Sequence, residues 1–206
     1  MSAPKKYIPT RATEQARAIL YTQPTNPKPA IAQVIYAPNH TTPLYPVSIF
    51  LAGSICQDKA PQWQLSAIAH LAHLPITIYN PRVSDWDPNL RQDAGEKRFK
   101  DQVLWELKNL QACDVIMMYL APDEEGQAMD APISLMEFGR FANDKRLIVG
   151  CPERFNRRGN VDITGKFYGT RVVDDFHTLV RETTRKLEVA IAIAKESAKA
   201  AKHCRR

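Results

Sequence analysis

Two glutamates occupy positions where their carboxylates could do chemistry. Glu137 stands in "DAPISLMEFGRFANDKRLIVGCP", residues 130–152, a pattern that predicts a helix leading into a buried strand. Glu106 stands in "LWELKNL", eight residues before Asp114 and the apolar run that follows it. Two carboxylates that converge on one pocket suit glycosyl transfer, because one can attack the anomeric carbon while another group manages the leaving-group proton. The alternative is an exposed Glu137, since Glu is a good helix former.

Two further segments place polar side chains in loops. In "AGSI", Gly53 permits close approach of a ligand and the Ser54 hydroxyl could bind a sugar or phosphate, although the pair could also be only a turn. In "YNPRVSDWD", an exposed Trp could stack on a nucleobase, or it could fold back over the core. The candidate binding residues of this second loop are Asn80, Arg82, Asp85 and Trp86.

A third loop, "CPERFNRRGN", is basic. Its two adjacent arginines and Asn160 could bind a phosphate, or they could simply complete the loop. Asp130 opens the helix that carries Glu137, and we predict that it is the N-cap, with Pro132 in the first turn.

Apolar runs alternate with helical patterns from residue 47 onward. The runs predict five buried strands, and the amphipathic patterns predict the helices between and after them. This alternation predicts an α/β, flavodoxin-like fold, a doubly wound five-stranded parallel sheet in the order 2-1-3-4-5 with an N-terminal arm and a long C-terminal helix. The expected strands lie within 47–53, 75–81, 114–122, 145–152 and 169–175, and the expected helices within 60–74, 96–113, 130–142 and about 176–201.

The predicted organisation is an arm over residues 1–46 and one α/β domain over residues 47–206. The arm is rich in Pro and Thr, and its short apolar run at 31–37 could add an edge strand. In a sheet of this order, ligands bind outside the carboxyl ends of the strands, at the switch point between the first and third strands. The polar loops described above follow these strands, so we expect the site at that edge.

Composition narrows the class of protein. Apolar residues make up 44% of the chain and charged residues 24%, which is ordinary for a globular domain, and no apolar run approaches the length of a membrane span. Four scattered cysteines without metal-ligand spacing favour a reducing, cytoplasmic location, with a mitochondrial presequence as the alternative. The net charge of +6 gathers at the chain ends, so nucleic-acid binding is not the expected function.

The chain resembles the nucleoside 2-deoxyribosyltransferase family, and in particular its "nucleoside 2-deoxyribosyltransferase-like" branch. The resemblance covers about residues 47–175 and is carried by five segments in this order: "FLAGSI", "YNPRVSDWD", "QVLWELKNLQACDVIMMY", "APISLMEFGRFA" and "CPERFNRRGNV". It implies a flavodoxin-like fold and exchange of the base between 2-deoxyribonucleosides through a covalent deoxyribosyl-enzyme. It implies neither a metal nor an organic cofactor.

The resemblance also implies roles for particular residues. Glu137 in "MEFG" matches the nucleophile of the family's "M-E-L-G" helix, and Glu106 matches an acidic residue that helps to hold the sugar. Asp130 loosely matches an Asp before the nucleophile's helix, and Ser54 matches a serine that contacts a 5′-phosphate in related phosphohydrolases. A homo-oligomer is implied as well, because family members complete the pocket with a neighbouring subunit's C-terminal residues, where this chain has a basic helix.

Three other functions share parts of this pattern. A hydrolase of the same fold would use Glu137 to cleave the N-glycosidic bond of a deoxynucleoside, a nucleotide or NAD, and basic loops would favour a phosphorylated substrate. A binding module would sense a nucleotide without turning it over, and an interaction protein would use the basic terminal helix. The leading prediction is base exchange on a small-molecule nucleoside.

Overall fold

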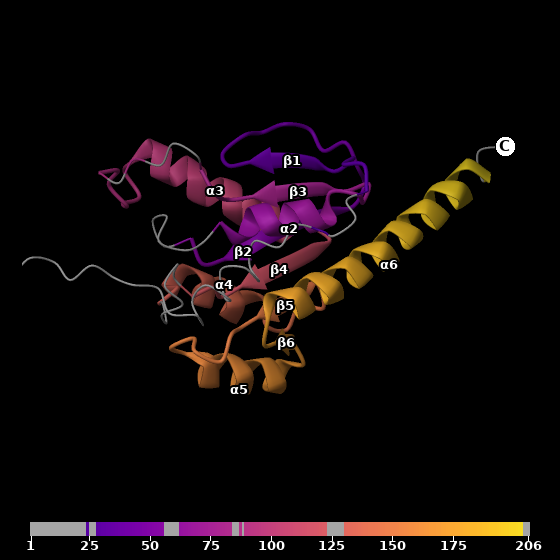
Figure 1. Cartoon of the computed structure of the whole chain (residues 1–206). Helices are drawn as coiled ribbons and strands as arrows, with labels where there is room; N and C mark the ends of the chain where they lie inside the picture. Colours follow the sequence, from indigo (N-terminus) through magenta and orange to yellow (C-terminus); the bar gives the residue numbers. More distant parts are fainter. Residues whose placement is uncertain are drawn as a thin grey trace, which may run out of the picture.

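The computed structural model describes residue 24 and residues 28–55, 62–83, 87, 89–122 and 130–203. Asp85 and Trp86, two predicted binding residues, lie outside the described residues. Parallel strands alternate with helices, as the sequence predicts (Figure 1). The strands are β1 (Gln33–Tyr36), β2 (Ser48–Gly53), β3 (Thr77–Asn80), β4 (Val115–Tyr119), β5 (Leu147–Gly150) and β6 (Arg171–Val173), and the helices are α2 (Trp63–Leu71), α3 (Lys97–Ala112), α4 (Pro132–Phe141), α5 (Arg158–Tyr168) and α6 (Phe176–His203).

The strands form one parallel sheet in the order β1-β3-β2-β4-β5-β6. The last five strands have the predicted 2-1-3-4-5 order, so the flavodoxin-like expectation is confirmed. The predicted count of five strands is one too low, because β1 adds an edge strand that pairs with β3 from Gln33 opposite Thr77 onward. The Thr77 hydroxyl donates to the side-chain oxygen of Gln33 at 3.0 Å, which fixes this register. The run at 31–37 therefore contributes a strand to the sheet.

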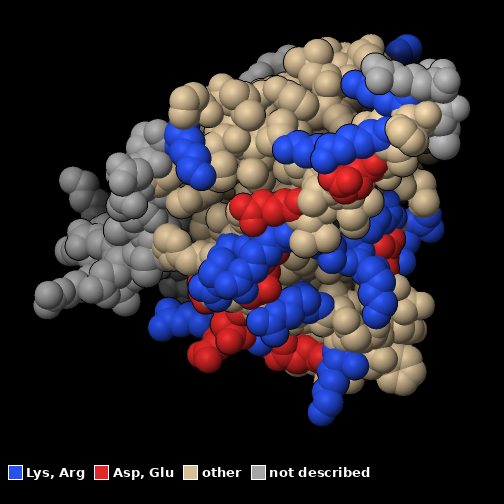
Figure 2. Space-filling view, turned by 90° about the vertical axis from the view of Figure 1, so that its right-hand side faces the viewer, with Lys and Arg blue, Asp and Glu red and all other residues tan. Residues whose placement is uncertain are grey.

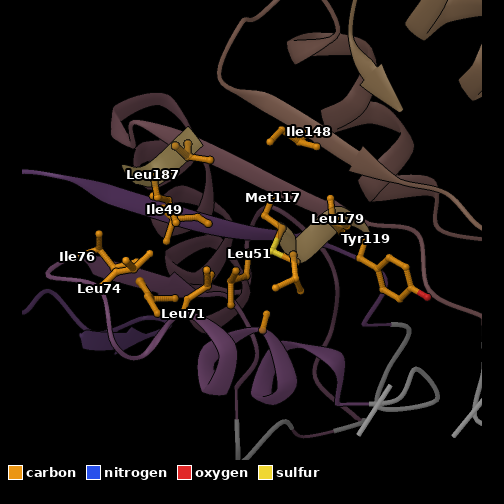
Figure 3. Close-up of a cluster of buried hydrophobic side chains, with 14 of the residues drawn as sticks. Ile49, Leu51, Leu71, Leu74, Ile76, Met117, Tyr119, Ile148, Leu179 and Leu187 are labelled. Carbon is orange, nitrogen blue, oxygen red and sulfur yellow. The ribbon is translucent and has the colours of Figure 1, made fainter. Parts of the chain in front are cut away.

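Helices cover both faces of the sheet. On one face α2 and α6 pack against alternate strand residues such as Ile49, Leu51 and Met117 (Figure 3). On the other face α3, α4 and α5 pack against the residues between them, including Phe50 and Met118. Successive side chains of a strand point to opposite faces, so continuous apolar runs are what a sheet covered on both sides requires.

Helix α6 is the longest element, with 28 residues. Its first half packs on the sheet through Phe176, Leu179 and Leu187, and the predicted range of about 176–201 is confirmed within two residues. Packing against the core continues through Ile191 and Ala194, and the residues of α6 after them extend beyond the sheet, away from the edge where the strand arrows end (Figure 1). No helix in the described ranges is long and apolar enough to cross a membrane.

Two local predictions are wrong. The segment after β5 was predicted to be a loop, but residues 158–168 form α5; two internal glycines weaken its helical signal, and few of its residues are buried. Helix α4 begins at Pro132 as predicted, but its N-cap is Ala131 rather than Asp130, and no side chain caps it. Asp130 lies one position before this N-cap, so its carboxylate does not cap the helix.

Positive and negative charges are mixed on the face of the molecule toward which the end of α6 points. Figure 2 shows Lys and Arg side chains interleaved with Asp and Glu side chains and with broad uncharged areas. Exposed ion pairs occur among the charged side chains of the protein, for example Lys199 with Glu196 at 2.7 Å. The excess of positive charge is thus divided among separate positions on this face.

Candidate active site at the carboxyl edge of the sheet

Glu106 and Glu137 come together from two neighbouring helices. Helix α3 carries Glu106 and helix α4 carries Glu137, and both side chains are half-buried. Burial, and to a lesser extent the charge of Glu106, raises the pKa of Glu137 to about 8, so the two carboxyls interact electrostatically. Burial likewise raises the pKa of Glu106 to about 7, against a lowering effect of the hydrogen bond from Gln102.

This pairing gives the site an acid and a base at once. Two carboxyls that share a dry environment cannot both be charged without a large cost, so near neutral pH they hold about one proton between them. One carboxyl can then donate a proton while the other, as an anion, can attack an electrophilic carbon. A single exposed glutamate would offer only the anion.

Gln102 secures one of the two carboxyls. It lies one turn before Glu106 on α3 and is 8% exposed. Its side-chain nitrogen donates to the Glu106 carboxyl at 2.6 Å and to the carbonyl oxygen of Pro81 at 2.9 Å. Pro81 follows β3 directly, so this amide links the acidic pair to the loop at the carboxyl end of that strand.

The turn after β2 brings backbone and hydroxyl groups to the same edge. Gly53 has φ +133°, and a Cβ at this position would lie 2.1 Å from the carbonyl oxygen of Tyr119, so only glycine fits. The Ser54 amide donates to that carbonyl at 3.0 Å, and the Trp63 ring nitrogen donates to the Ser54 carbonyl at 3.0 Å. The Ser54 side chain is buried, and its hydroxyl has no hydrogen-bond partner within the described part of the chain.

The end of β3 supplies a second polar group at this edge. Asn80 is buried, and its side-chain oxygen accepts from the Arg82 amide at 3.0 Å. The Arg82 guanidinium donates to the side-chain oxygen of Gln64 at 3.4 Å. Gln64 is fully buried in the first turn of α2, and its side-chain nitrogen has no hydrogen-bond partner among the residues described. No motif marks Gln64 in the sequence; its only signal is a polar residue beside Trp63 at the start of an apolar helix.

Two other predicted residues occupy different surroundings. Asp130 is exposed and accepts from the side-chain nitrogen of Asn156 at 3.2 Å. Asn160 is exposed in the first turn of α5. Beside it, the Arg158 guanidinium bonds Asp162 and Asp174, both at 2.7 Å, and the Cys151 carbonyl. Those bonds make Arg158 a connector between α5 and the end of β6, which argues against the phosphate contact considered from the sequence.

Other potentially reactive side chains, one aspartate and two cysteines, lie in surroundings that give them a role in the fold. Asp114, at the opposite edge of the sheet, accepts from the Ser48 amide at 2.7 Å and from its hydroxyl at 3.1 Å. Burial raises the pKa of the Cys113 and Cys151 thiols to about 12, so neither is a ready nucleophile. Over the described ranges, no group of three or more His, Cys, Asp or Glu residues could hold a metal ion.

A hollow elsewhere on the molecule has a different character. It measures about 370 Å³ and lies between α6 and the turn before β3, where Leu74 and Ile191 contribute its apolar lining and Lys195 a charge. Because Leu74 precedes β3, this hollow lies at the amino ends of the strands. It is therefore separate from the acidic pair.

The fold and the paired carboxyls define a class of α/β protein suited to chemistry at a glycosidic carbon. A family model described as "Nucleoside 2-deoxyribosyltransferase like" matches residues 46–155, more than half of the chain, and the chain belongs to that family. The matched range contains Glu106, Glu137, Ser54 and Arg82, and it leaves out β1, α5, β6 and α6. Membership supports a nucleoside glycosyl-transfer function in general terms and a small-molecule nucleoside as substrate. No match was found among curated proteins.

Proposed function

We propose that the protein exchanges the base of 2-deoxyribonucleosides, with Glu137 as the nucleophile and Glu106 as the group that transfers the proton of the base. The observation that carries this proposal is the pair of half-buried carboxyls, both with raised pKa, on the two helices of the site. Family membership supplies the sugar-base bond as the target.

The reaction proceeds in two steps with the same groups. The pair holds its proton mainly on Glu137, whose pKa is the higher of the two, so this proton first passes to Glu106. A carboxylate oxygen of Glu137 then forms a bond to C1′ as the C1′–N bond breaks, and the departing base takes the proton from Glu106. A nitrogen of a second base then attacks C1′ of the glycosyl ester, which releases the Glu137 carboxylate. Glu106 recovers its proton from the incoming base, so the enzyme returns to its starting state.

Base exchange is tested by chromatography of 2′-deoxyinosine incubated with the protein, with and without free adenine. We expect deoxyadenosine only when adenine and active protein are both present. Glu137→Gln, which keeps the size of the side chain, should abolish the product, whereas Glu188→Gln, at an exposed position on α6, should leave the rate unchanged. Exchange by Glu137→Gln at an undiminished rate would exclude Glu137 as the nucleophile.

Trapping of the intermediate gives a second test. Acid quenching during turnover, followed by mass spectrometry of the intact protein, should show a species heavier by one deoxyribosyl group. Peptide mapping should place the added group on Glu137. A mass that never changes while base exchange proceeds would argue for direct transfer between the two bases.

Hydrolysis of a 5′-phosphorylated substrate is the second candidate. Two buried groups favour it, the Ser54 hydroxyl and the Gln64 side-chain nitrogen, because neither has a hydrogen-bond partner among the described residues. Gln64 stands in the first turn of α2, where no side chain caps the helix and backbone N–H groups favour an anion, and Ser54 is joined to this turn by the hydrogen bond from the Trp63 ring nitrogen to its carbonyl. A phosphate would offer these donors the acceptors that they lack.

The two candidates differ in product and in substrate. A hydrolase would release hypoxanthine from 2′-deoxyinosine 5′-monophosphate with or without adenine, and would form no deoxyadenosine product. Ser54→Ala should then weaken the use of the monophosphate and leave the use of the unphosphorylated nucleoside unchanged. If the variant lowers both equally, Ser54 does not contact a phosphate.

A further inference from the structure

Gln102 is a buried polar residue to which the sequence assigns no role. Its side-chain nitrogen lies 2.9 Å from the Pro81 carbonyl oxygen and 2.6 Å from a carboxyl oxygen of Glu106, the one named Oε1. A backbone carbonyl can only accept, so the amide nitrogen must face it, and its second hydrogen points to Glu106. Both hydrogens of this amide are therefore committed.

This geometry makes the two oxygens of the Glu106 carboxyl unequal. Oε1 receives a hydrogen from Gln102, and a carboxyl proton on the same oxygen would compete with that hydrogen for the same space. A protonated Glu106 therefore carries its proton on the other oxygen, Oε2. When that proton leaves, the carboxylate that remains already has a charge-assisted hydrogen bond on Oε1.

We propose that Gln102 is a positioning residue that holds Glu106 through Oε1 against the loop after β3 and reserves Oε2 for proton exchange with the departing base. This inference rests on the proposed function and adds to it which carboxyl oxygen of Glu106 exchanges the proton. In the first step the Oε2–H bond breaks as an N–H bond forms on the base, and the electron pair stays on Glu106.

The surroundings of Glu106 set the direction of the expected effect. Glu137 on α4 interacts with it electrostatically, and the Pro81 carbonyl, directly after β3, accepts from Gln102. An ionised Glu137 disfavours a charge on Glu106, whereas the hydrogen bond from Gln102 favours it. Removal of the amide should therefore raise the pH at which Glu106 titrates.

NMR measures the titration of Glu106 directly. Carboxyl signals of protein labelled with ¹³C at glutamate are followed by NMR over pH, and Glu106→Gln identifies the Glu106 signal. Gln102→Leu should raise the midpoint by about one to two pH units, the shift that corresponds to one hydrogen bond to a charged group. Gln102→Glu, which keeps the shape and replaces the donor, should raise it further. Gln111→Leu, an exposed amide on the same helix, is the control.

The pH dependence of base exchange is then compared for the same variants. We expect the limb of the pH–kcat profile that reflects Glu106 ionisation to move together with the NMR midpoint. The value of kcat should fall about tenfold, with little change in KM. An unchanged midpoint in both Gln102 variants would overturn the inference, as would a midpoint that moves while the pH profile of kcat does not. Wild-type protein that titrates as expected but exchanges no base would instead overturn the proposed function.

Discussion

Glu137→Gln should stabilise the protein, and the gain should increase with pH. The folded protein holds the Glu137 proton up to a pKa of about 8, whereas an unfolded glutamate loses its proton near the ordinary pKa of 4.5. Between these two values the native state binds more protons than the unfolded state, so the free energy of unfolding falls as pH rises. Glutamine carries no charge at any pH and escapes this loss.

The size of the gain follows from the pKa shift and from the exposure of the side chain. The full shift corresponds to roughly 5 kcal/mol at 1.36 kcal/mol per unit, which is an upper limit. Glu137 is only half-buried, so solvent screening and relaxation reduce this to about 2 kcal/mol. In a protein of this size, 2 kcal/mol raises Tm by about 4 to 8 °C.

The assay is thermal unfolding followed by circular dichroism from about pH 4 to about pH 9. The difference in Tm between Glu137→Gln and wild type should be near zero at the acidic end, should grow through neutral pH, and should level off above about pH 8. Glu188→Gln, at an exposed position, should give a small difference that does not change with pH. A Tm difference for Glu137→Gln that stays constant with pH would refute the assignment of a desolvated carboxyl.

Three further changes test other parts of the structure. Gly53→Ala should lower the free energy of unfolding by about 3 kcal/mol or more, because its Cβ would lie 2.1 Å from the Tyr119 carbonyl oxygen. Gly139→Ala, in an open helical position, should instead raise the free energy of unfolding by about 0.5 to 1 kcal/mol. Denaturant unfolding of both variants measures the contrast. Asp114→Ala should lower the free energy of unfolding by about 1 to 3 kcal/mol through loss of its two bonds to Ser48, and an unchanged urea midpoint would contradict this. Ser54→Ala should leave Tm unchanged or slightly higher, since it removes a buried hydroxyl without a hydrogen-bond partner among the described residues. If the phosphate site exists, calorimetry of the same variant should show about tenfold weaker binding of 2′-deoxyribonucleoside 5′-monophosphates.

The sheet could be predicted because its signals are local and repeated. Each central strand is a continuous apolar run, and the right-handed crossover rule leaves few ways to order such strands. The edge strand β1 was foreseen only as an option, because Gln33 and exposed Tyr36 give it a mixed pattern. Helix α5 could not be recognised, since its stability comes from Arg158 contacts and a few buried residues rather than from helix propensity.

The site was predictable in part. Glu106 and Glu137 were found because each is an acid on an otherwise amphipathic or apolar helix, and the family resemblance pointed to the same two residues. The size of their pKa shifts could not be predicted, because the extent of burial is a property of the packed molecule. Gln102 gave no signal and Gln64 only that of a polar residue at the start of an apolar helix, since an amide acquires a role only through the groups that it contacts.

The projecting end of α6 bears on how the protein can be handled. At 1.5 Å per residue its 28 residues span about 42 Å, roughly twice the length of β2, so its far end stands well clear of the sheet. It points away from the edge that carries the glutamates (Figure 1). Immobilisation on a surface through this end would therefore orient every molecule with its acidic pair toward the solution, separated from the support by a stiff spacer.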